Sequence, residues 1–268
     1  MAPGAASAAG HQVDLVGHIV DHSYLELPFL GRIDLPRSPP IWGVDVSITS
    51  HVVMMWVASA LLVGLLLLAF RPSGSGPSRL AGFFEVIIIY LRDEVVLSVM
   101  GERGRPFLPF ILTVFFFILA CNLIGLVPYA VTPTGDIGVT AALALVSFFA
   151  TQAVGIARNG LRGYVRSLVP SGVPLPLLVI LVPIEIVGLL AKPFALCIRL
   201  FANMMAGHVA ILVFLSIPIM IGSYVVAPEA VALGVALYLF EIVIAFVQAF
   251  IFALLTTVFV SLAAHPSH

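Results

Sequence analysis

Residues 185–208 read EIVGLLAKPFALCIRLFANMMAGH, a stretch that carries charges inside a long apolar region. A charged side chain at the centre of a bilayer costs at least about 2.5–3.5 kcal/mol on insertion scales. Glu185, Lys192 and Arg199 are spaced seven residues apart, two helical turns each, and so form one stripe along a helix. Asn203 follows Arg199 by four residues and shares its face. A polar stripe in hydrocarbon must face a partner or a water-filled path.

The composition indicates a polytopic membrane protein. The chain has 268 residues, of which 61% are hydrophobic and 9% charged, and its mean hydropathy is +1.18. The net charge of −1 suggests no nucleic-acid partner. The N-terminus lacks a basic segment followed by an apolar core, so we expect no cleaved signal peptide. Cys121 and Cys197 lie in apolar runs, which favours packing over a disulfide or a metal site.

Hydropathy divides the chain into an N-terminal extramembrane arm, residues 1–45, and a single transmembrane helical domain, residues 46–268. The predicted fold class is all-α, a polytopic membrane protein with about five membrane-crossing helices. The expected spans are about 47–70, 107–127, 137–157, 174–226 and 229–263. Residues 79–100 predict an additional helix that either lies on the membrane surface or forms a re-entrant hairpin. In the arm, His18 and His22 suit a metal pair, but a solvated amphipathic arm is the favoured interpretation.

The last two apolar runs are too long to cross a membrane upright. A helix over residues 176–217 is roughly 60 Å long, whereas the hydrocarbon core is about 30 Å thick. No hydrophilic loop divides this run, so we expect one steeply tilted helix with a kink near Pro193. The run 229–263 is also overlong, and a join near residues 227–228 makes the two helices an antiparallel hairpin.

This hairpin distributes its polar groups along the membrane depth. Glu185 lies about 21 Å before Arg199 along the helix, and His208 about 13 Å after it. On the antiparallel last helix, pairing of Gln248 with Arg199 brings Glu241 near His208. Histidine and carboxylate groups can pass protons, whereas arginine is effectively never deprotonated. The pattern predicts two offset half-channels separated by a fixed positive charge.

Several of these side chains also have plain structural explanations. Lys192 can snorkel or meet a lipid head group, and Glu185 can simply pair with Lys192. Asn122 can close a helix end, and His208 can be a satisfied interior histidine. Arg199 is different, because it has no acid three or four residues away. It therefore predicts a partner subunit that carries a membrane-embedded carboxylate.

The basic residues predict the orientation of the chain. By the positive-inside rule, the N-terminus is outside and, after five crossings, the C-terminus is cytoplasmic. Two loop groups on one side hold Arg71, Arg79, Arg92, Arg103, Arg105, Arg158, Arg162 and Arg166, and the other side has Arg32 and Arg37.

Three segments resemble subunit a of the F-type ATP synthase family, over roughly residues 45–264. They are KPFALCIRLFANMMAGH at 192–208, FEIVIAFVQAFIFALLTTVFVS at 240–261 and NLIGLVPYAVTPTGDIGVT at 122–140. The resemblance implies that Arg199 is the essential arginine that faces the ring of subunit c and interacts with each passing ring carboxylate. The remaining implied positions are Asn203, Gln248, the exchanged pair His208 and Glu241, Glu185 on the cytoplasmic side, and Asn122 toward the outer half-channel. Gly125 departs from the pattern, because some relatives have an acid there.

The same resemblance implies a rotary-motor subunit with no catalytic site of its own. Protons would enter from outside, ride on the ring carboxylates and leave on the cytoplasmic side, which couples proton flow to ATP synthesis. The implied partners are the subunit c ring, the peripheral stalk subunit b, other ATP synthase subunits and membrane lipids. The implied location is an energy-transducing membrane, the bacterial inner membrane above all. Whether the ion is H⁺ or Na⁺ depends on the ring and stays open.

Two other classes of protein were considered. A stand-alone ion-coupled secondary transporter would show internal repeats or matching broken helices in two halves, and the sequence shows neither. A haem-binding respiratory subunit needs facing histidines within spans, but only His208 lies deep, with His51 near a span end. We therefore expect no cofactor.

Overall fold

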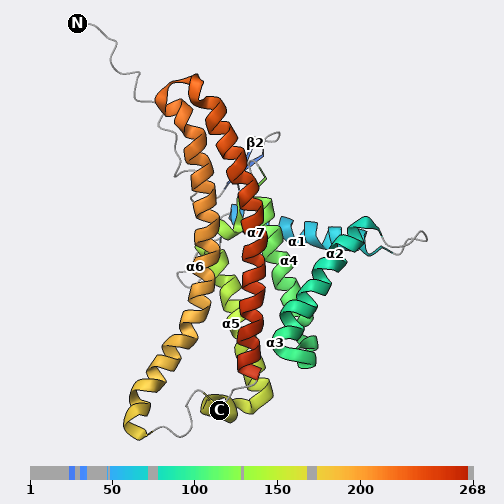
Figure 1. The fold of residues 1–268 in the computed structure, drawn as a ribbon, viewed down its shortest axis with the longest axis vertical. Helices are drawn as coiled ribbons and strands as arrows, with labels where there is room; N and C mark the ends of the chain where they lie inside the picture. The colour runs from blue at the N-terminus through green and yellow to red at the C-terminus, as the bar shows by residue number, and fades with distance from the viewer. Residues whose placement is uncertain are drawn as a thin grey trace.

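The computed structural model describes residues 24–27, 31–34, 47, 49–71, 78–127, 130–167 and 174–264. Within these ranges the membrane part is helical, as predicted (Figure 1). The main helices are α1 (Ser50–Ala69), α2 (Arg79–Tyr90), α4 (Leu108–Gly125), α5 (Ile137–Ser167), α6 (Leu175–Ile221) and α7 (Ala227–Ala264). Five segments are long and apolar enough to cross a membrane: Ser50–Ala69, Arg79–Gly125, Ile137–Tyr164, Leu177–Ile221 and Ala227–Ala264.

The N-terminal arm contains a small element that hydropathy did not predict. Strands β1 (Tyr24–Leu27) and β2 (Gly31–Asp34) form an antiparallel hairpin in which Tyr24 is opposite Asp34. Within the described part of the chain, these are the two strands that accompany the helices. The possible metal pair His18 and His22 lies outside the described residues.

Residues 79–125 form a helical hairpin, so the additional helix predicted for 79–100 is present and packs antiparallel to α4 (Figure 1). Helix α2 continues through the π-helical turns of η1 (Leu91–Leu97) and the short α3 (Ser98–Met100). Gly101, with φ of 61°, then starts the 3₁₀ turn η2 (Gly101–Phe107), which reverses the chain into α4. Phe84 of α2 packs edge-on against Phe116 of α4, with ring centroids 5.6 Å apart.

Helices α6 and α7 form the long antiparallel hairpin that the sequence predicts (Figure 1). Their 47 and 38 residues correspond to about 70 and 57 Å. Helix α6 ends at Gly222, whose φ of 65° breaks the helix, and the turn η4 (Tyr224–Val226) leads into α7. The turn therefore comes a few residues before the expected join, and the first turns of α6 diverge from α7 (Figure 1).

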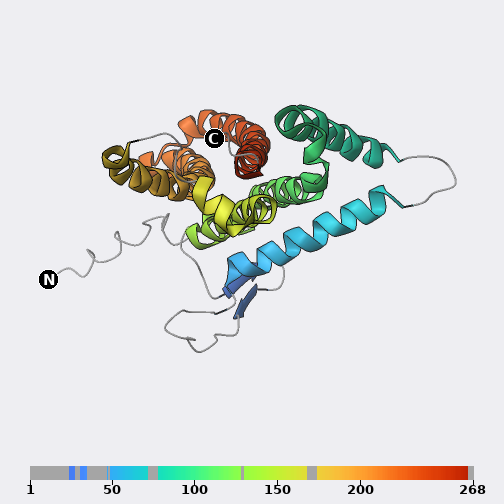
Figure 2. The ribbon, with the colours of Figure 1, turned by 90° about the horizontal axis from the view of Figure 1, so that it is seen from below.

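The direction of helix α1 can be compared with that of the long hairpin. Its 20 residues span about 30 Å, the thickness of the hydrocarbon core. In two perpendicular views α1 runs across the direction of α6 and α7 (Figures 1 and 2). If α1 stands upright, the long helices are strongly inclined, as their lengths require.

Small residues let α7 approach its neighbours closely. Ala245, Ala249 and Ala253 are spaced one helical turn apart, and all three are fully buried. Ala249 and Ala253 belong to the main apolar core, which combines residues of α2, η1, α4, α6 and α7. Cys121 and Cys197 are buried free thiols, in agreement with their predicted packing role.

We expect Ala249→Leu to destabilise the protein by about 1–3 kcal/mol, because the added side chain overpacks a closely packed helix contact. The measurement is the melting temperature of the purified protein in detergent. Ala236→Leu is the matched control, because Ala236 is an exposed alanine of the same helix. Equal melting temperatures for the two variants would contradict the close packing of α7.

Candidate functional site

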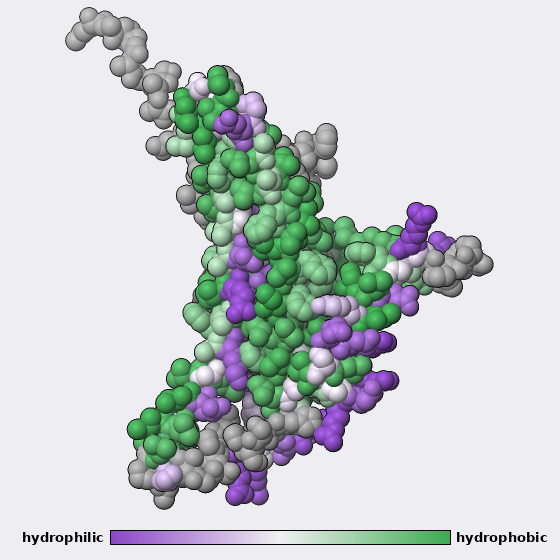
Figure 3. Space-filling view, viewed as in Figure 1, coloured by the Kyte–Doolittle hydropathy of each residue, from purple (hydrophilic) through white to green (hydrophobic). Residues whose placement is uncertain are grey.

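A line of hydrophilic atoms runs along the α6–α7 hairpin, between wide apolar surfaces (Figure 3). On α6, Glu185 and Arg199 are exposed and Lys192 is half-buried. Among the described residues, no carboxylate forms an ion pair with Arg199 or with Lys192. The ammonium of Lys192 lies instead 5.4 Å from the ring centroid of Phe259, a cation–π contact. The structural alternative of a Glu185–Lys192 pair is therefore not formed.

One turn beyond Arg199, a pair of side-chain amides joins the two long helices. The Nδ2 of Asn203 donates a hydrogen bond to the Oε1 of Gln248 at 3.2 Å, and Gln248 is only 3% exposed. Antiparallel pairing predicts Gln248 beside Arg199, whereas the hydrogen bond that Gln248 accepts comes from Asn203. The pair fixes the register of α6 against α7 next to the arginine.

Farther along the hairpin, His208 and Glu241 meet, as the antiparallel pairing predicts. The Nδ1 of His208 lies 3.8 Å from the Oε1 of Glu241, within ion-pair range but longer than a hydrogen bond. Glu241 is 2% exposed, and neither of its carboxyl oxygens has a hydrogen-bond partner among the described residues. A buried carboxyl group without donors is costly and is typical of a functional position.

Gly207 makes room for this carboxyl group. A Cβ added at Gly207 would lie 2.8 Å from the Cδ of Glu241 and even closer to one carboxyl oxygen. A side chain at position 207 would therefore displace the carboxyl group of Glu241 from its place against α6.

The structure adds two residues to this cluster, His51 of α1 and Thr132, which precedes the 3₁₀ turn η3 (Pro133–Gly135). The hydroxyl of Thr132 forms a hydrogen bond with the Nε2 of His208. The backbone carbonyl of Thr132 accepts a hydrogen bond from the Nδ1 of His51 at 3.0 Å. The sequence signal for His51 was a histidine at a span end, considered only for haem, and no periodicity singles out a loop threonine.

Asn122 holds the same loop to α4 and α7. Its Oδ1 accepts a hydrogen bond from the hydroxyl of Thr134 at 2.7 Å, and its Nδ2 donates to the carbonyl of Ala245 at 3.4 Å. Asn122 and Thr134 are both fully buried. Its amide thus joins three segments, rather than closing the end of its own helix.

The packing around Gly125 explains why this chain has no acidic residue at position 125. A Cβ at Gly125 would lie 2.7 Å from the Cβ of Thr132 and closer still to its Oγ1 and Cγ2. The space that an acidic side chain would need at position 125 is filled by Thr132, which reaches His208 from there.

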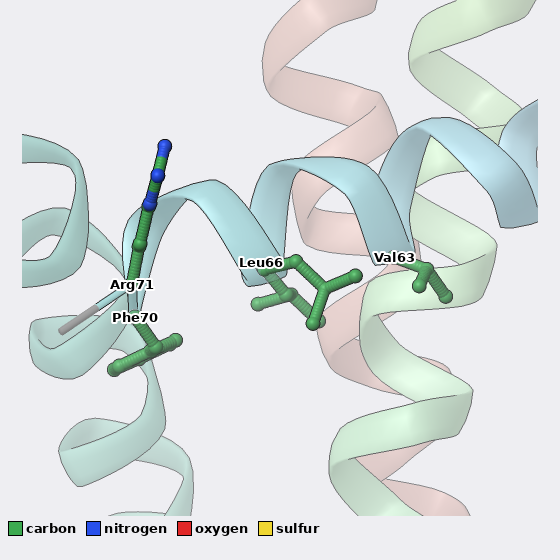
Figure 4. Close-up of a pocket in the computed structure, with 5 residues that line it drawn as sticks. Val63, Leu66, Phe70 and Arg71 are labelled. Atoms are coloured by element: carbon green, nitrogen blue, oxygen red, sulfur yellow. The ribbon is translucent and has the colours of Figure 1, made fainter.

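A separate pocket lies away from this cluster, at the end of α1 (Figure 4). It has a volume of about 430 Å³ and is lined by Val63, Leu66, Leu67, Phe70 and Arg71. It contains no acid, histidine or nucleophile, so it lacks the groups that proton transfer requires.

The long helical hairpin carries a buried carboxyl group beside His208 and an exposed arginine that has no carboxylate partner among the described residues. In a multi-pass helical protein this combination defines the class of ion-translocating membrane subunits. A family model described as ATP synthase A chain matches residues 52–261. The chain belongs to this family.

Relatives support the assignment over nearly the whole chain. The chain is 43% identical to ATP synthase subunit a 2 of Chlorobium luteolum over 274 residues, which cover 97% of this chain and 80% of the relative. It is 42% identical to ATP synthase subunit a of Chloroherpeton thalassium, covering 96% and 78% of the two chains. The corresponding protein of Myxococcus xanthus is 42% identical, with 84% and 75% covered.

Membership in this family confirms the prediction of an ATP synthase subunit and supports it over the alternative of a stand-alone transporter. The chain is the ion-translocating subunit a of a rotary ATP synthase, works with other subunits of that assembly and has no catalytic role by itself.

We expect Gly207→Ala to lower proton-driven ATP synthesis at least about tenfold, because the added methyl group displaces the carboxyl group of Glu241. The measurement is ATP synthesis in energised membrane vesicles, normalised to the amount of assembled enzyme. Gly64→Ala is the control, because a Cβ at Gly64 meets no atom within 4 Å. Full activity of Gly207→Ala would show that the placement of Glu241 against α6 does not matter.

Proposed function

We propose that this chain provides two offset aqueous half-channels that carry protons to and from the carboxylates of a rotating subunit c ring. The observation that carries the proposal is Arg199, an exposed cation on a long apolar helix without a carboxylate partner among the described residues. A cation in that position requires a counter-charge from another subunit. A membrane-embedded acid on the ring is such a partner.

The half-channel toward the outside contains His208 and Glu241. Both groups can accept and release a proton, and the 3.8 Å between them allows transfer after a small movement. Asn203 and Gln248 hold α6 and α7 together between this cluster and Arg199. Asn122, by fastening the loop over the cluster, forms part of the wall.

The half-channel toward the cytoplasm contains Glu185. This residue precedes Arg199 by 14 positions, about 21 Å along the helix, and is exposed on the same stripe. It can accept a proton from a ring carboxyl group after nearly a full rotation. Arg199 lies between the two groups, favours the ionised form of the carboxylate that faces it, and stays charged itself. A proton therefore cannot pass directly from one half-channel to the other.

We also propose a stalk partner for this chain and its orientation in the membrane. The peripheral stalk subunit b would hold the chain against the torque of the ring. The arginine-rich loops would face the cytoplasm across a bacterial inner membrane, with the N-terminus outside. Each proton that crosses a potential of 100 mV then releases about 2.3 kcal/mol.

Replacing Arg199 by Ala should abolish proton-driven ATP synthesis, because both the barrier and the attraction for the ring carboxylate are lost. The measurement is synthesis in inverted vesicles energised by respiration, at matched levels of assembled enzyme. Lys192→Ala is a control from the same stripe, and it should keep most of the activity because the ammonium of Lys192 is held by Phe259. Normal synthesis by Arg199→Ala would refute the proposed function.

Replacing Glu185 by Gln should slow ATP synthesis several-fold without changing assembly, because the amide cannot accept the departing proton. Glu185→Asp keeps a titratable group and should retain more activity than Glu185→Gln. Identical rates for the two variants would remove Glu185 from the proton path.

A further inference from the structure

We propose that the hydroxyl of Thr132 is a proton-transferring group on the outer side of His208, and that His51 is the positioning residue that holds Thr132 in place. The inference rests on the proposed function and extends its outer half-channel by two residues. It starts from a chain of contacts that runs from α1 through the loop after α4 to α6 and α7.

Most of the chain of contacts is enclosed by protein, and His208 at its centre is partly exposed, with 26% of its side chain accessible. Thr132 is 7% exposed, His51 5% and Glu241 2%, although the first two belong to a loop and to the first turn of a span. Gly125 has no side chain at the point where Thr132 packs on α4, so Thr132 lies against that helix. Loop residues are usually exposed, and a loop threonine packed this tightly needs a reason.

The partners of His208 define what the threonine hydroxyl does. The Nδ1 of His208 faces Glu241, and the Nε2 faces the Oγ1 of Thr132. When neutral His208 carries its proton on Nδ1, Nε2 is an acceptor and the hydroxyl of Thr132 donates to it. When His208 is protonated on both nitrogens, Nε2 donates and the same hydroxyl accepts. A hydroxyl can do both, so this contact is maintained in either charge state of the ring.

Each proton and each bond can be followed when a proton passes through the hydroxyl of Thr132. A proton that arrives at the Oγ1 of Thr132 forms a new O–H bond while the original hydroxyl proton moves to the Nε2 of His208. Thr132 is neutral again, and His208 is doubly protonated. The Nδ1 proton then passes to the carboxylate of Glu241, which leaves His208 neutral and Glu241 protonated. The starting state returns when Glu241 passes its proton to a carboxylate of the subunit c ring, His208 exchanges its Nε2 proton through solvent for one on Nδ1, and the Thr132 hydroxyl rotates back toward Nε2.

His51 acts on this path through the backbone of Thr132. A carbonyl oxygen can only accept a hydrogen bond, so the Nδ1 of His51 must carry a hydrogen whatever the charge of the ring. This bond fixes the loop to α1 and aims the hydroxyl of Thr132 at His208. Asn122 and Thr134 hold the next turn of the same loop from the other side.

The test compares Thr132→Val with Thr132→Ser in vesicles that contain the complete enzyme. Valine has nearly the shape of threonine but can neither donate nor accept a proton, whereas serine keeps the hydroxyl. We expect Thr132→Val to lower proton-driven synthesis at least about tenfold and Thr132→Ser to restore most of it. If valine and serine variants at equal assembly have equal rates, the hydroxyl transfers no proton and the proposal is overturned.

His51 is tested with His51→Asn and His51→Leu. The side-chain amide of asparagine places a donor near the position of Nδ1 but does not titrate, so we expect near-normal synthesis, whereas leucine should lower it several-fold. Because His51 acts through Thr132, adding His51→Leu to the Thr132→Val variant should not lower the rate of ATP synthesis any further. An asparagine variant as slow as the leucine variant, or additive losses in the double variant, would overturn the positioning role.

Two further variants distinguish a failure of this proposal from a failure of the proposed function on which it rests. Arg199→Ala and Glu241→Gln are measured in the same vesicles. If both lose synthesis while Thr132→Val is normal, only the extension to Thr132 is wrong. If Arg199→Ala retains synthesis, the half-channel function itself is wrong.

Discussion

The structure depends on one electrostatic constraint, the placement of a permanent cation on an apolar helix. The guanidinium of Arg199 cannot lose its charge, and no described carboxylate of the chain pairs with it. Burial in lipid without a counter-charge is therefore excluded, and the helix must present this residue to a partner. The amide pair of Asn203 and Gln248 holds the two long helices together one turn away, which keeps the cation at a defined position along the hairpin.

The fold was largely predictable because its helices follow from the positions and lengths of apolar runs in the sequence. Apolar runs predicted the spans, and the excess length of the last two predicted the long antiparallel hairpin that α6 and α7 form. The π-helical and 3₁₀ turns at residues 91–107 were not predictable, because hydropathy does not distinguish these turns from an ordinary α-helix. Each strand of the β-hairpin in the arm has only four residues, which is too short for a hydropathy pattern to mark it as a strand.

The candidate site was predictable only where its residues lie on regular helices. Helical spacing and antiparallel pairing brought His208 to Glu241, because both follow from geometry that a sequence displays. Thr132 joins the cluster through a loop conformation, and His51 joins it because α1 packs beside that loop. Neither contact follows from spacing, since each depends on how three separate segments fold together. The absence of a side chain at Gly125 acquires its meaning only from these contacts.

The close approach of Thr132 to Gly125 has a consequence for how such sequences diverge. An acidic side chain at position 125 and a threonine at position 132 compete for one volume, so a lineage cannot acquire the acid first and keep the loop unchanged. A side chain at residue 207 would likewise compete with the carboxyl group at 241, which would have to move. Substitutions at these paired positions are therefore epistatic, and the order in which they arise limits the routes by which titratable groups can move from one helix to another during evolution.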